Sequence, residues 1–137
     1  TKPLFHNVFA MWMYFPQHKA EATQLSVTVR DGTWIVEHDY YLPAVREMFL
    51  MSKVERVLVP TLKLLREQGT LRPDWRAYLK TALFCCPFLT MNLADSQRFP
   101  PDIALLGLAM SVEMGAESDQ KRSRIDQALD AVQHALD

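Results

Sequence analysis

The chain has 137 residues, of which 49% are hydrophobic and 23% charged, as is typical of one soluble globular domain with a sizeable core. Its 15 basic and 16 acidic side chains give a formal charge of −1, which argues against a nucleic-acid binder driven by bulk electrostatics. The longest uncharged run, residues 81–94, is too short to cross a bilayer, so we expect no membrane span. We find no signal peptide, and two adjacent cysteines are no disulfide framework, so we expect a cytoplasmic location.

The first predicted element covers residues 5–15, an aromatic-rich segment that is apolar on both alternating faces. This pattern indicates a buried strand, with a short helix as the alternative. Pro16 ends the segment, and a polar connection follows over residues 17–23.

Residues 24–40 carry the clearest local signal, because two β-rich runs flank Asp31-Gly32. Asp-Gly between two such runs is typical of a two-residue hairpin turn, since both central positions need a positive φ. The resulting register places three pairs on one face: Val29–Trp34, Val27–Val36 and Leu25–His38. We expect Trp34 to point into the core from this face, and we expect the hairpin to form a three-stranded antiparallel meander with the first strand.

From residue 42 onward, apolar residues recur at spacings of three and four, which predicts helices. The first helix starts near Pro43 and is capped at Gly69. Pro60 must kink this helix or split it in two, because proline lacks the backbone N–H that the helix needs.

The helix that begins near Asp74 is expected to be the centre of the fold. Residues 82–89 carry no polar side chain, so the other elements must surround this helix, which is bent or broken at Pro87. Cys85 and Cys86 lie in the same run, and we expect both thiols to be buried, reduced and unreactive.

Two more helices complete the chain. Residues 103–114 are apolar nearly all round and should lie beside the central helix, with Gly107 permitting a close approach and Gly115 ending the helix. Residues 119–136 are amphipathic, with charges that oppose the helix dipole at both ends. This last helix packs on its own domain or, alternatively, on another protein chain or a missing N-terminal part.

The predicted fold class is therefore α+β, in a single domain over residues 1–137. A three-stranded antiparallel meander occupies a β-rich part, residues 1–41, and four to five packed helices occupy residues 42–137. Because the chain begins at Thr1 inside a hydrophobic segment, one interpretation is that it forms the C-terminal portion of a longer protein.

His38 and Asp39 end a predicted strand just before a helix, where they either cap the helix at Pro43 or face a cleft. Asn7 precedes a β segment and the hairpin, and Asp39 follows the hairpin. This order resembles the protein-kinase pattern of a catalytic-loop Asn followed by a metal-binding Asp. The resemblance implies Mg and ATP as cofactors, with Asn7 and Asp39 as metal ligands. The glycine-rich loop, nucleotide-binding lysine and catalytic aspartate of that family have no counterpart here.

A basic stripe is the other candidate binding feature. On an ideal helix, four basic side chains of the first predicted helix fall within a third of its circumference: Arg46, Lys53, Arg56 and Lys63. They form either an anion-binding or partner-binding stripe or the solvated face of an amphipathic helix.

No motif in the chain specifies an enzyme. The leading hypothesis is a non-catalytic structural or protein-interaction domain of a larger protein, with no cofactor. The alternative is the C-terminal, substrate-side lobe of a kinase-like small-molecule phosphotransferase.

Overall fold

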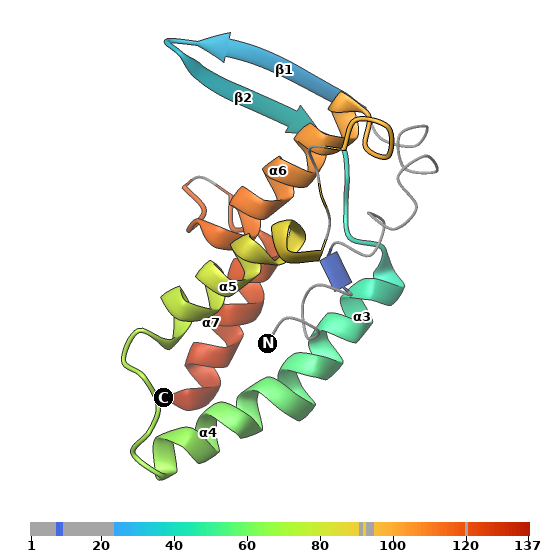
Figure 1. Cartoon of the computed structure of the whole chain (residues 1–137). Coiled ribbons are helices and arrows are strands. Elements are labelled where there is room, and N and C mark those ends of the chain that lie inside the picture. The colour runs from blue at the N-terminus through green and yellow to red at the C-terminus, as the bar shows by residue number, and fades with distance from the viewer. Residues whose placement is uncertain (1–7, 10–23, 91, 93–94, 120) are drawn as a thin grey trace.

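A computed structural model describes most of the chain: residues 8–9, 24–90, 92, 95–119 and 121–137. These residues form a two-stranded antiparallel sheet and four helices, so the α+β class is confirmed (Figure 1). The hairpin projects from one end of a helical body. None of the described helices combines the length and the apolar character needed to span a bilayer.

The prediction of a strand in residues 5–15 is wrong for the two residues of that segment that the structure describes. Val8 and Phe9 are helical, with 2% and 6% of their surface exposed, and they belong to the main core. A short apolar run does not distinguish a strand from a buried helix by its period, and here the helical alternative holds. The rest of that segment lies outside the described residues.

The hairpin register is confirmed. Strand β1 (Leu25–Arg30) pairs antiparallel with β2 (Thr33–His38), and Val29 lies opposite Trp34. Asp31 and Gly32 have φ values of 52° and 75°, the positive values that a two-residue turn of this kind requires.

The predicted burial of Trp34 is wrong, because 64% of its surface is exposed. Among the described elements, helix α6 (Pro101–Gly115) contacts β2, and no third strand pairs with the hairpin. The apolar face near the turn therefore remains in solvent.

The first helix is continuous across Pro60 (Figure 1). It comprises α3 (Ala44–Lys53), the π-helical segment η2 (Val54–Leu58) and α4 (Val59–Glu67). A proline ring clashes with the carbonyl four residues earlier in a regular α-helix, and the wider π turn placed just before Pro60 relieves that clash. The sequence predicted the perturbation at Pro60 but not that it would take the form of a π turn.

Helix α5 (Trp75–Thr90) runs beside α6, and Pro87 lies inside it without ending it. Gly115 makes their close approach possible, since a Cβ on it would lie 2.7 Å from the Cβ of Phe84. The sequence predicted Gly107 in this role. The prediction that other elements surround α5 on every side is also wrong, because Phe84 and Phe88 are 41% and 44% exposed.

Helix α7 (Arg124–Leu136) starts five residues later than predicted. Its apolar stripe is buried in the core of its own domain: Ile125, Leu129, Val132 and Leu136. Asp126 therefore lies in the first helical turn, where a negative charge favours the helix dipole rather than opposing it.

Candidate functional site

The hairpin presents an apolar face to solvent. Val29 and Trp34 are each 64% exposed, and Val27 is 37% exposed. A two-stranded hairpin is marginally stable alone, and a Trp on such a face is normally covered. These three exposed side chains all belong to the hairpin, which projects from the helical body in Figure 1.

Asp39 closes the base of the hairpin. Its carboxylate accepts a hydrogen bond from the Gln24 N–H at 2.8 Å, and its own N–H donates to the Gln24 carbonyl at 3.2 Å. Helix α3 has no side-chain cap at Pro43, so the expectation that Asp39 caps this helix is wrong. Both the carboxylate and the N–H of Asp39 are instead bonded across the hairpin to the backbone of Gln24.

The predicted metal pair cannot be assembled from the described residues. Asn7 lies outside them, so its pairing with Asp39 stays a prediction. In the part of the chain that is described, no three His, Cys, Asp or Glu side chains gather in a way that would hold a metal ion.

The predicted basic stripe runs along the continuous first helix. Arg46 and Lys53 are partly buried there, whereas Arg56 and Lys63 are exposed. None of the four lines the cleft described below, and their role in binding stays a prediction.

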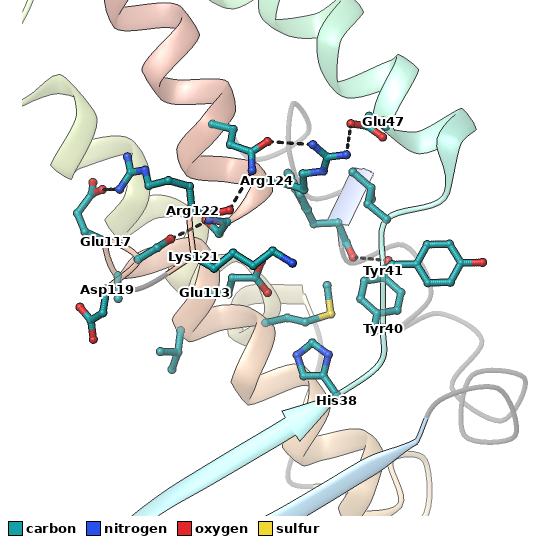
Figure 2. A pocket seen from close by; sticks show the side chains of 18 of the residues that line it. His38, Tyr40, Tyr41, Glu47, Glu113, Glu117, Asp119, Lys121, Arg122 and Arg124 are labelled. Atoms are coloured by element: carbon teal, nitrogen blue, oxygen red, sulfur yellow. Dashed lines mark hydrogen bonds and ion pairs between the residues drawn. The ribbon is translucent and has the colours of Figure 1, made fainter.

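A cleft of about 1030 Å³ opens at the base of the hairpin (Figure 2). Its walls come from the end of β2, the start of α3, the end of α6 and the start of α7. Phe9 and Met110 give it an apolar lining, and Tyr40 and Tyr41 add aromatic rings. Volumes of about 300–1,000 Å³ are typical of small-ligand sites, so this cleft is at the upper end of that range.

Three polar groups in the cleft lack partners among the described residues. His38 Nδ1 is buried without a hydrogen bond. Glu113 and Lys121 are exposed side chains of opposite charge that line the cleft, and neither forms an ion pair with another described residue. Partial desolvation of the Glu113 carboxyl by the residues around it raises its pKa, and the nearby His38 ring partly offsets that rise.

Tyr40 forms the aromatic wall next to His38. The two ring centroids lie 6.5 Å apart, and the Tyr40 hydroxyl donates a long 3.4 Å hydrogen bond to the Phe9 carbonyl. Burial raises the pKa of this phenol to about 12, so the hydroxyl remains a neutral donor at physiological pH.

A buried carboxylate holds the loop that forms the opposite wall. Asp126 has no exposed surface and accepts hydrogen bonds from Lys80, itself 3% exposed, and from the hydroxyl and N–H of Ser118. Burial alone would raise the pKa of Asp126, but the hydrogen bonds from Lys80 and Ser118 outweigh it and hold the pKa well below its usual range.

Further ion pairs extend this network to the surface. Arg76 donates to Glu117 at 2.8 Å and to Asp130 at 2.9 Å, and Arg122 donates to Asp130 at 2.7 Å. These bonds tie α5 both to the segment between α6 and α7 and to α7 itself. The cleft wall is therefore fixed by charged contacts as well as by apolar packing.

Sequence reasoning missed Asp126 as the centre of this network. The segment Ser123-Arg124-Ile125-Asp126 is the local signal that points to it, because Ser followed three residues later by an acid is typical of a helix start. In the structure the Ser123 hydroxyl accepts from the Asp126 N–H at 3.2 Å. Lys80 and Ser118 have no such local signal.

Comparison with known proteins finds no matching family model, curated protein or solved structure.

Proposed function

We propose that this chain is a non-catalytic protein-interaction domain of a larger protein, and that the apolar face of its hairpin is the contact surface. The observation that carries this proposal is the 64% exposure of both Trp34 and Val29 on a projecting element. Exposed apolar faces that contain a Trp are typical of protein contact sites, where aromatic anchors supply much of the binding energy.

The composition of the hairpin face indicates what kind of surface the partner presents. Val27, Val29 and Trp34 carry no charge, so the partner presents an uncharged apolar surface to them. A standard interface uses about 20–30 residues on each side, so the partner must reach beyond the hairpin onto the neighbouring helices. A larger protein surface meets this requirement better than a single added strand.

The phosphotransferase alternative, with Mg and ATP, gains no support from the described residues. It depends on Asn7, which lies outside them, and on Asp39, whose carboxylate already accepts from the Gln24 N–H.

Site-specific photo-crosslinking in the cells that contain the protein tests the proposal. A photoreactive phenylalanine analogue is placed at position 34 or 29, and as a control at Thr28, which is exposed on the other face of the hairpin. We expect one discrete adduct from positions 34 and 29 and none from position 28. We also expect Val29→Lys to abolish the adduct formed from position 34, because it places a charge in an apolar contact.

Failure to form an adduct at either position would contradict the proposal. Equal adducts from positions 34 and 28 would contradict it as well, since they would show contact without preference for the apolar face.

A further inference from the structure

We propose that the cleft at the base of the hairpin binds a small zwitterion, a short peptide with a free ammonium and a free carboxylate. This inference is independent of the proposed function, because the residues that carry it lie in the cleft and not on the exposed hairpin face.

The charges of the cleft define the ligand class. Four acidic and three basic side chains line it: Glu47, Glu113, Glu117, Asp119, Lys121, Arg122 and Arg124. This near balance disfavours a polyanion such as a nucleotide and also disfavours a polycation. Several of these charges already have partners, since Arg124 contacts Glu47 at 2.6 Å and Arg122 contacts Glu117 at 3.2 Å.

Glu113 and Lys121 are the opposite charges that remain for a ligand near the middle of the cleft. In Figure 2 both side chains lie in the central part of the view with His38, whereas Asp119 lies toward its left edge. Two exposed opposite charges that line one cavity and are not paired with each other are suited to the two ends of one zwitterion, which replaces the water at each.

His38 adds a third polar contact. Its Nδ1 is buried and unpartnered, and the ring lines the same cleft as Glu113. With the ring proton on the other nitrogen, Nδ1 accepts a hydrogen bond. A ligand ammonium placed between Glu113 and His38 therefore finds two acceptors, which satisfies the buried nitrogen.

The remaining surface accommodates the body of the ligand. Met110 and Phe9 offer apolar contact, and the Tyr40 ring lies next to His38, with 6.5 Å between the two ring centroids. The volume of about 1030 Å³ exceeds the need of a single small amino acid and suits a short peptide with an apolar side chain.

Titration calorimetry with the 137-residue chain and glycyl-phenylalanine tests the inference. Two blocked forms of the same dipeptide serve as comparisons, one with an acetylated amine and one with an amidated carboxylate. We expect glycyl-phenylalanine to bind at millimolar or lower concentration, and each blocked form to bind about tenfold or more weakly, because each lacks one charge-assisted contact.

Two variants identify which side chain binds each end of the dipeptide. Glu113→Gln should remove the preference for the free amine, and Lys121→Met should remove the preference for the free carboxylate. Glu55→Gln and Lys63→Met, both exposed and outside the cleft, should leave binding unchanged. Absence of binding at millimolar dipeptide would overturn the inference, as would equal binding of the blocked forms to the unmodified chain. Binding that the two control variants weaken as strongly as the cleft variants would also overturn it.

Discussion

Replacing Asp126 with Asn should destabilise the domain more than any other single change in the ion network. Lys80 is 3% exposed, and its remaining acidic neighbour would be Glu117 at 3.6 Å. The substitution keeps the shape of the side chain but leaves the Lys80 ammonium buried without its main counter-charge. A buried ammonium without a partner carries a large desolvation cost.

The expected loss of stability depends on which buried charge each variant leaves without a partner. Removing one partner of a buried ion pair costs about 3–5 kcal/mol, so Asp126→Asn should fall in this range. Lys80→Met should cost only about 1–3 kcal/mol, because Asp126 would keep the Ser118 N–H at 2.9 Å and Arg76 at 3.3 Å. The double variant should lose about 0.5–3 kcal/mol less stability than the two single variants added together, because it contains no unpaired buried charge.

Urea denaturation of the four proteins at pH 7, followed by circular dichroism, measures these differences in stability.

The loss of stability as the pH is lowered is a second measurement. The folded-state pKa of Asp126 is depressed, so its contribution is fully present above the unfolded pKa of about 3.9 and is lost as the pH falls toward the folded value. Stability of the parent chain should therefore fall between about pH 5 and the acid limit, and more steeply than that of Asp126→Asn.

Two results would refute this reasoning. One is a loss below about 1 kcal/mol in Asp126→Asn, which would mean that Lys80 finds water or another partner without difficulty. The other is an identical acid dependence in the parent chain and in Asp126→Asn, which would mean that Asp126 is not the titrating group.

Three further predictions concern packing, thiols and the hairpin turn. Gly115→Ala should lower the free energy of unfolding by about 1–3 kcal/mol in thermal or urea melts, because its Cβ meets that of Phe84; an unchanged stability would contradict the close approach. Native alkylation followed by peptide mapping should modify the partly exposed Cys85 well before Cys86, which is 1% exposed, and equal rates would be inconsistent with their positions. Gly32→Val should abolish amide-exchange protection in the hairpin while α7 keeps its own, since a β-branched residue resists a φ of +75°; a protected hairpin in this variant would refute the turn assignment.

The features that the sequence predicted correctly are those specified by neighbouring residues. Asp31-Gly32 determines the turn and, through its two-residue length, the pairing of Val29 with Trp34. Whether anything covers that pair depends on elements elsewhere in the chain or in a partner, so alternation alone placed Trp34 in a core that does not reach it. The same limit applies to Cys85, which was expected to be buried and is only partly so.

The cleft was not predictable, because four separate elements bring its residues together. His38 and Glu113 are 75 positions apart in the chain, and no local pattern relates a strand end to the last turns of α6. Asp126 illustrates the intermediate case. The preceding Ser123 indicates a helix start, whereas the buried Lys80 that defines the role of Asp126 comes from α5.

Under the proposed function, the hairpin face is open in the isolated chain and covered by a partner in the native assembly. Radical footprinting of Trp34 in the purified chain and in the complex isolated from its cells tests this directly, with Tyr78 as an internal reference that is 54% exposed on α5. We expect strong labelling of Trp34 in the purified chain and strong protection in the complex, with Tyr78 labelled in both. Protection of Trp34 already in the purified chain, or equal labelling in the two samples, would contradict it.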